Sequence, residues 1–264
     1  MITSFLHDIY KSRNLIWELS KRDYKQQNQG SYLGVFWNYL QPILFVTVLY
    51  AVFTLGFKTG NDTNIPFSLY LISGMVCWLY FVENLNAMTN VIRNYSFLVK
   101  KVDFRLSILP VVKLTSTFLP HLILTTLAIG FSASQGWTPS WHLLQLIYYY
   151  ICMALLLLGV GWLTSSTNIF IKDIGNIVSV ISQFGFWVTP ILWQVETIPQ
   201  KFQWILNLNP AYYLVTGYRD AILSQQWFWH KIEESLIFWG ITLTLVVLGV
   251  YVFKSLKPHF AEVI

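Results

Sequence analysis

Charged side chains are scarce in this chain. Asp, Glu, Lys and Arg make up 11% of its 264 residues, whereas soluble domains carry about 25%. Hydrophobic residues make up 55%, so a folded chain of this length has too few charges to keep its surface in water. Much of that surface must face lipid, and the composition therefore predicts an integral membrane protein.

The sequence also lacks the motifs of the common catalytic centres. It has no GxxxxGK[ST] phosphate loop, no HExxH, no CxxC and no Gly-x-Ser-x-Gly elbow. The 2 cysteines, Cys77 and Cys152, lie inside apolar runs, and the 5 histidines show no metal-ligand spacing. We therefore expect a chain that is not an enzyme, has no ATPase site of its own and binds no cofactor itself.

Long apolar runs dominate the sequence instead. A spanning helix needs about 20 mostly apolar residues, and six stretches approach this length, which predicts an all-α integral membrane fold with six transmembrane helices. They lie at about 36–57, 67–90, 109–131, 143–165, 175–193 and 234–253. The region 194–233 is broken by Asn207, Asn209 and Pro210, so we expect short re-entrant helices there, covered by protein or a wet cavity.

The basic residues predict the orientation, because Lys and Arg concentrate in cytoplasmic loops. Most of the 17 basic residues fall on one side of the predicted spans: Lys11, Arg13, Lys21, Arg22, Lys25, Arg93, Lys100, Lys101, Arg105, Lys172, Lys254 and Lys257. The other side has Lys58, Lys201, Arg219 and Lys231, and Lys113 falls within the third span. This bias predicts that both termini are cytoplasmic.

The chain divides into a polar N-terminal region, 1–35, and a transmembrane domain, 36–264. In the N-terminal region Ile9, Leu15, Ile16 and Leu19 recur at roughly helical spacing with charges between them. This pattern favours an amphipathic helix at the cytoplasmic membrane interface. A solvated basic arm is the alternative.

Polar residues inside the spans are candidates for function. Glu83 is the only acid deep in a span, and Asn86 and Asn90 share its helix face. This stripe lines a conduit or gate, or forms a structural network at a helix or subunit interface. His121, in the third span, is a functional candidate or a packing residue.

Aromatic residues cluster in the first and fifth spans. Phe36, Trp37 and Tyr39 open the first, and Phe184 and Trp187 lie in the fifth near Gln183. Aromatic faces can stack on sugar rings, but they also anchor helices at membrane interfaces. Both interpretations stay open.

Several stretches, in order along the whole chain, resemble the permease subunit of type-2 ABC exporters, in the polysaccharide branch that exports O-antigen, capsule or teichoic acid. They are Arg13-Asn14-Leu15-Ile16-Trp17-Glu18-Leu19, Lys21-Arg22-Asp23-Tyr24-Lys25, Ser31-Tyr32-Leu33-Gly34-Val35-Phe36-Trp37, Gln41-Pro42, Asn168-Ile169-Phe170-Ile171-Lys172-Asp173-Ile174, Asn209-Pro210-Ala211-Tyr212-Tyr213 and Tyr218-Arg219-Asp220-Ala221-Ile222-Leu223. Lys172 stands where the family usually has arginine.

The resemblance implies a homodimer of this chain that works with two copies of a separate ABC ATPase, which binds ATP and Mg. The implied contacts with that ATPase are a coupling segment with Lys100, Lys101, Asp103, Phe104 and Arg105, and a smaller contact at Lys172 and Asp173. The implied partners are lipid-linked polysaccharide and membrane lipids, with no nucleic acid, in the bacterial inner membrane.

The resemblance also implies three substrate regions. The glycan channel would comprise Phe36, Trp37, Tyr39, Glu83, Gln183, Phe184 and Trp187. A gate for the lipid-linked head group would comprise Arg13, Lys21, Arg22, Lys25, Tyr32 and Gly34, although these basic residues could equally attract anionic lipid or set topology. The re-entrant region would comprise Asn209, Pro210, Tyr218, Arg219 and Asp220.

Two other functions remain as alternatives to polysaccharide export. The same architecture could export drugs, lipids or peptides. A membrane-embedded transferase would need clustered acids, histidines or metal ligands facing one side of the membrane, and the sequence offers only dispersed groups.

Overall fold

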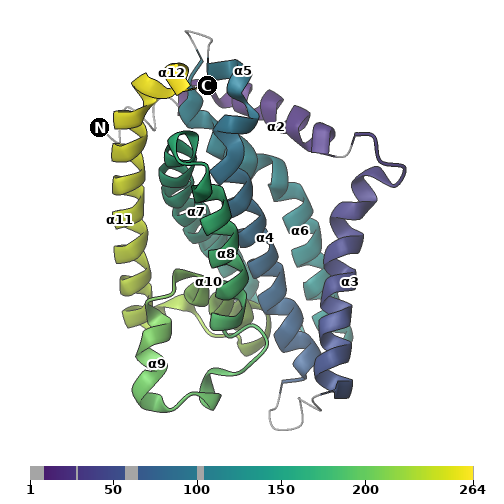
Figure 1. Cartoon of the computed structure of the whole chain (residues 1–264). Helices are drawn as coiled ribbons and strands as arrows, with labels where there is room; N and C mark the ends of the chain where they lie inside the picture. The colour runs from purple at the N-terminus through teal and green to yellow at the C-terminus, as the bar shows by residue number, and fades with distance from the viewer. Residues whose placement is uncertain (1–8, 28, 57–64, 100–103, 264) are drawn as a thin grey trace.

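The structure is a computed structural model that describes residues 9–27, 29–56, 65–99 and 104–263. Over these residues the chain is helical and contains no β-strand. The helices are α2 (Arg13–Gln27), α3 (Trp37–Ala51), α4 (Phe67–Asn94), α5 (Ser96–Val99), α6 (Leu109–Ser134), α7 (Gln145–Phe170), α8 (Asp173–Val188), α9 (Gln200–Asn207), α10 (Pro210–Arg219), α11 (Ile232–Leu256) and α12 (Phe260–Val263). Figure 1 shows the long helices running side by side, with α2 lying across one end of the bundle.

In the described part of the chain, five helical segments are long and apolar enough to cross a membrane. They are Gly34–Gly56, Phe67–Asn94, Leu106–Ser134, Trp141–Phe170 and Phe228–Val263. These segments correspond to five of the six expected spans. The chain is therefore a multi-pass membrane protein by the length and composition of its helices.

The remaining expected span, 175–193, corresponds to the shorter helix α8, which has 16 residues. At 1.5 Å per residue α8 is about 24 Å long, less than the roughly 30 Å of a bilayer core. It ends early because Pro190 follows Thr189, and a residue before proline is pushed out of the helical region. Thr189 has φ −78° and ψ 132°, an extended conformation. α8 nevertheless runs beside α4 and α7 (Figure 1).

α4 is the central helix of the bundle. It contacts α3, α6, α7, α8 and α10, and its buried side chains belong to the main hydrophobic core. α7 also packs closely against α11, and the two helices meet at Gly159 of α7 and Gly249 of α11. A Cβ on Gly159 would lie 2.8 Å from the backbone nitrogen of Val246, and one on Gly249 would clash with the carbonyl oxygen of Gly159. Small residues allow this close approach of two helices in a membrane.

α3 is held less tightly than the other long helices. It contacts α4 and α6, yet none of its residues is buried. Ile43, Leu44 and Val48 are 45%, 51% and 59% exposed. A helix this apolar and this exposed needs lipid or another protein surface around it.

One end of the bundle gathers α2, α5, the turn between α7 and α8, and α12. A single hydrophobic cluster joins Ile9, Val91, Leu98, Ile169 and Phe260 there. Both described ends of the chain thus meet at the end shown uppermost in Figure 1. The Lys and Arg residues that the sequence analysis assigns to the cytoplasmic side lie, where they are described, on elements at this end.

The short helices α9 and α10 lie at the opposite end, between α8 and α11 in the chain (Figure 1). The interruption of the apolar sequence by Asn207, Asn209 and Pro210 predicts such short helices rather than a spanning one. Asn209 caps α10, since its Oδ1 accepts a hydrogen bond from the backbone nitrogen of Ala211 at 3.1 Å. Pro210 occupies the first turn, where its missing N–H costs nothing. α10 packs against α4, α7 and α11, and most of its residues are buried.

Candidate functional site

A cavity of ≈ 1040 Å³ lies between α3, α4, α6 and α8. Its aromatic lining comprises Trp37, Phe45, Trp78, Tyr80, Phe186 and Trp187. Its polar lining comprises Gln27, Asn38, Gln41, Glu83, Asn86, His121, Ser179, Ser182 and Gln183. The wall therefore combines flat apolar surfaces with side chains that can form hydrogen bonds, which is the usual composition of a small-molecule site.

The cavity lining includes four of the seven residues expected to form a glycan channel: Trp37, Glu83, Gln183 and Trp187. The other three, Phe36, Tyr39 and Phe184, lie outside it. Phe36 and Phe184 are 55% and 68% exposed. The sequence did not single out Trp78 and Tyr80 on α4, because a helix that is apolar on most sides does not reveal which face meets a cavity.

The polar stripe on α4 has two different roles. Asn86 accepts a hydrogen bond from Ser179 Oγ of α8 at 2.9 Å, and Asn90 accepts one from Asn168 Nδ2 of α7 at 3.1 Å. Both asparagines thus hold α4 against its neighbours, as the structural interpretation expects. Glu83 lines the cavity, as Asn86 also does, and its role in a conduit stays a prediction.

His121 is buried in the core and also borders the cavity. Its side chain is 5% exposed and stacks on Tyr80, with ring centroids 4.2 Å apart. Its Nε2 lies 2.8 Å from the hydroxyl of Tyr218, the α10 residue that the resemblance places in the re-entrant region. His121 therefore connects α6, on the cavity wall, to α10.

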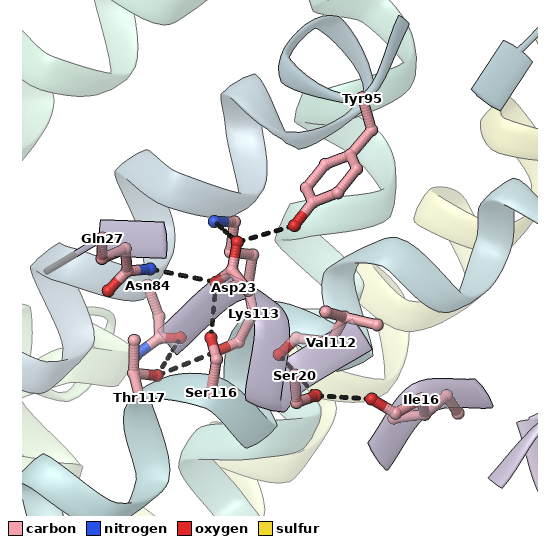
Figure 2. A network of polar contacts seen from close by, with 10 residues as sticks. All are labelled: Ile16, Ser20, Asp23, Gln27, Asn84, Tyr95, Val112, Lys113, Ser116 and Thr117. Atoms are coloured by element: carbon pink, nitrogen blue, oxygen red, sulfur yellow. Dashed lines mark hydrogen bonds and ion pairs between the residues drawn. The ribbon is translucent and has the colours of Figure 1, made fainter. Parts of the chain in front are cut away.

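Asp23 attaches α2 to the bundle through a buried network (Figure 2). Its Oδ1 accepts hydrogen bonds from Lys113 Nζ at 2.5 Å and from the Tyr95 hydroxyl at 2.7 Å. Its Oδ2 accepts from Ser116 Oγ at 2.8 Å and from Gln27 Nε2 at 3.0 Å. A buried ion pair is stable when other groups satisfy its remaining lone pairs, and three further donors, Tyr95, Ser116 and Gln27, do so here.

The network pairs two ionisable groups, Asp23 and Lys113, that the sequence analysis did not connect. Lys113, the lysine inside the third predicted span, is 7% exposed and Asp23 is 4% exposed. Burial, together with the hydrogen bond to Asp23, raises the pKa of Tyr95, so the phenol keeps the proton that it donates. A lysine within a membrane span needs an acid to compensate its charge, but the sequence does not identify which acid pairs with it.

The face of α2 that meets the bundle is narrower and more polar than expected. Its buried residues are Ile16, Ser20 and Asp23, one helix face at i, i+4 and i+7. Ile16 packs against Ile108 and Val112, and Ser20 Oγ lies 3.2 Å from the carbonyl oxygen of Val112. The region is helical as expected, and it is docked on α6 rather than extended as a free arm.

The residues expected at the substrate gate lie on the outer surface of α2 and in the connection to α3. Arg13, Lys21, Arg22 and Lys25 are all exposed, and Tyr32 is 104% exposed. Gly34 has φ +48°, a left-handed conformation that favours glycine. Their role in binding a head group stays a prediction.

The described residues of the two expected contacts with an ATPase lie at the same end of the bundle. Lys100, Lys101 and Asp103 fall outside the described residues. Phe104 packs partly buried between two hydrophobic clusters at this end, and Arg105 begins the turn that leads into α6. Lys172 and Asp173 are exposed at the start of α8.

Arg219 is the buried anchor of α10 rather than an exposed basic residue. It is 6% exposed, and its guanidinium donates to the carbonyl oxygens of Tyr70 at 3.2 Å, Pro190 at 2.6 Å and Ile191 at 3.0 Å. The guanidinium also lies 3.5 Å from the centre of the Tyr70 ring. The next residue, Asp220, pairs with Lys231 at 2.5 Å. Both residues thus fix the short helices to the rest of this end.

The described residues form a multi-pass helical bundle with a cavity beside its central helix, which defines an integral membrane protein of the all-helical class. The chain belongs to the ABC-2 type transporter family, whose pattern matches residues 14–223. This match confirms the resemblance found in the sequence motifs.

Curated relatives cover nearly the whole chain. An O-antigen export system permease protein RfbA of Klebsiella pneumoniae is 29% identical over 257 residues, which is 95% of both chains. An O-antigen export system permease protein RfbA of Myxococcus xanthus is 25% identical over 262 residues, which is 97% of this chain and 98% of the relative.

Proposed function

We propose that this chain is the permease subunit of an ATP-driven exporter that moves polyprenyl-diphosphate-linked polysaccharide of the O-antigen type across the bacterial inner membrane. The proposal joins the family to the relatives, which are permeases of O-antigen export systems. The observation that carries it is the cavity beside α4, lined by aromatic and polar side chains with Glu83 as the one acid among the described lining residues. Sugars need both kinds of group, because their C–H faces are apolar and their hydroxyls form hydrogen bonds.

In this proposal the chain works as a homodimer with two copies of a separate ATPase. The cavity and the exposed α3 would face the second copy, which would complete the conduit. α8 would serve as a sixth, short span, and α9 and α10 would form the re-entrant region on the outer side. The end with α2, α5 and α12 would face the cytoplasm, so that both termini are cytoplasmic.

The ATPase would supply the ATP and Mg sites and would sit at this cytoplasmic end. The turn at Lys172 and Asp173 is exposed there and is available for contact. The segment with Lys100, Lys101, Asp103, Phe104 and Arg105 would form the main contact. The exposed basic residues of α2 would attract the diphosphate of the lipid carrier, since cations form charge-assisted hydrogen bonds with phosphate oxygens.

The test is ATP hydrolysis by this chain co-purified with its candidate ATPase and reconstituted in lipid. We expect stable association, and faster hydrolysis when polyprenyl-diphosphate-linked glycan is added than when the free glycan or the lipid carrier is added alone. Stimulation only by drugs or simple lipids would keep the architecture and change the substrate. Failure to associate with any ATPase would refute the exporter function.

A further inference from the structure

Glu83 brings a carboxylate into the cavity wall near the middle of α4. It lines the cavity, it is exposed to that space, and it has no hydrogen-bond or ion-pair partner among the described residues. Its neighbours on the same helix face differ, because Asn86 and Asn90 are bonded to α8 and α7. An acid inside a span that serves no structural contact is a candidate for contact with the transported molecule.

No cationic side chain compensates this carboxylate within the cavity. The described lining residues include no Lys and no Arg. Lys113, on the neighbouring helix α6, is committed to Asp23 at 2.5 Å. The described cavity lining therefore offers no cation to pair with the carboxyl group of Glu83.

Aromatic rings accompany the carboxylate along the same wall. Trp78 lies on α4, one turn and a half before Glu83, and its ring centroid is 6.1 Å from that of Phe186 on α8. Trp187 and Gln183 of α8 also line the cavity. Trp78 is only 5% exposed, so of these rings Trp187, at 60% exposed, is the one available to the apolar face of a sugar, whose hydroxyls can donate to the Glu83 carboxylate.

We propose that Glu83 makes the cavity selective for sugar units that are uncharged or carry amino groups, and that it disfavours units with carboxylate or phosphate substituents. An ionised carboxylate only accepts hydrogen bonds, so it pairs with hydroxyl or ammonium donors and repels other anions. This inference rests on the proposed function, and it names the class of glycan that the conduit takes. The diphosphate of the carrier is common to all such substrates and does not enter the comparison.

The experiment compares two polyprenyl-diphosphate-linked oligosaccharides of equal length, one of neutral hexoses and one with hexuronic acid units. Transport of each is measured in proteoliposomes that contain the full permease and its ATPase. We expect the wild-type protein to prefer the neutral oligosaccharide about tenfold, a factor that corresponds to about 1.4 kcal/mol. Coulomb's law gives a repulsion of this size between unit charges roughly 12 Å apart at the effective dielectric constant of about 20 that applies near a protein surface.

Glu83→Gln keeps the shape of the side chain and removes its charge, so we expect the preference to fall to about twofold or less. Glu83→Asp keeps the charge and should retain most of the preference. Glu233→Gln is the matched control, because Glu233 is exposed at the start of α11 and lies outside the cavity lining; its preference should equal that of the wild type.

Two outcomes would overturn the inference and leave the proposed function standing. One is a wild-type protein that transports both oligosaccharides equally well. The other is a preference that Glu83→Gln leaves unchanged. Transport of neither oligosaccharide, in a complex that hydrolyses ATP, would instead count against the proposed function itself.

Discussion

Removing the carboxylate of Asp23 should undock α2 and destabilise the whole protein. Asp23→Ala would leave Lys113 buried without its carboxylate, at 7% exposure, and would deprive Tyr95 of its acceptor and Ser116 of one of its two acceptors. Breaking a buried ion pair by removing one partner costs about 3–5 kcal/mol. We expect a loss of this size in the free energy of unfolding, measured by denaturant titration in mixed micelles.

A double-mutant cycle tests whether the unpaired lysine causes the loss. Lys113→Met should cost less than Asp23→Ala, because Asp23 would keep its hydrogen bonds from Tyr95, Ser116 and Gln27. Asp23→Ala combined with Lys113→Met should recover about 2 kcal/mol or more relative to Asp23→Ala, since no buried charge remains. Hydrogen exchange of the α2 amides should rise in Asp23→Ala and fall again in the double variant.

The matched control is the exposed pair on the same helix. Glu18 and Lys21 lie 3.1 Å apart, with side chains 65% and 54% exposed, and such pairs contribute up to about 1 kcal/mol. Glu18→Ala should therefore change stability far less than Asp23→Ala. Equal effects of the two substitutions, or a double variant whose loss is the simple sum of the single losses, would refute the role assigned to the network.

Three further substitutions test the packing and the cavity. Gly249→Ala should destabilise by about 1–3 kcal/mol, because its Cβ would meet the carbonyl of Gly159; Gly240→Ala on the same helix meets nothing within 4 Å, and an equal loss there would contradict the close packing of α7 and α11. Arg219→Lys should cost about 2–3 kcal/mol in the same titration, because an ammonium cannot reproduce the three bonds of the guanidinium fork; unchanged stability would rule out the anchor. Trp187→Ala should slow glycan transport in proteoliposomes without loss of assembly, whereas unchanged transport would leave Trp187 as an interface anchor.

The spans were predictable because hydropathy is a local property. Five of the six expected stretches appear as long helical segments, with ends shifted by five residues or fewer in four of them and by six and ten residues in the last. The end of α8 was misjudged, although Pro190 was visible in the sequence, because the apolar run continues through Ile191 and Leu192. Those two residues are buried as part of a bent connection rather than a helix.

The contacts between distant segments were not predictable in the same way. Asp23 and Lys113 are 90 residues apart, and several acids could have paired with a lysine in the third span. Arg219 looked like a basic residue of an outer loop, and only its carbonyl partners identify it as buried. The cavity wall depended on which face of each apolar helix points inward, and aromatic residues occur on both faces of α8, with Trp187 lining the cavity and Phe184 outside it.

The central claim is that glycan passes through the cavity beside α4, and site-specific photocrosslinking tests it most directly. A photoreactive residue would replace Gln183 in the cavity wall, or Leu243, which is 57% exposed on α11 and lies away from the cavity. The complex would be arrested during transport of a radiolabelled lipid-linked glycan and illuminated. We expect strong crosslinking of the glycan at position 183 and little at position 243. Crosslinking at 243 but not at 183, in a complex that transports glycan, would contradict the claim.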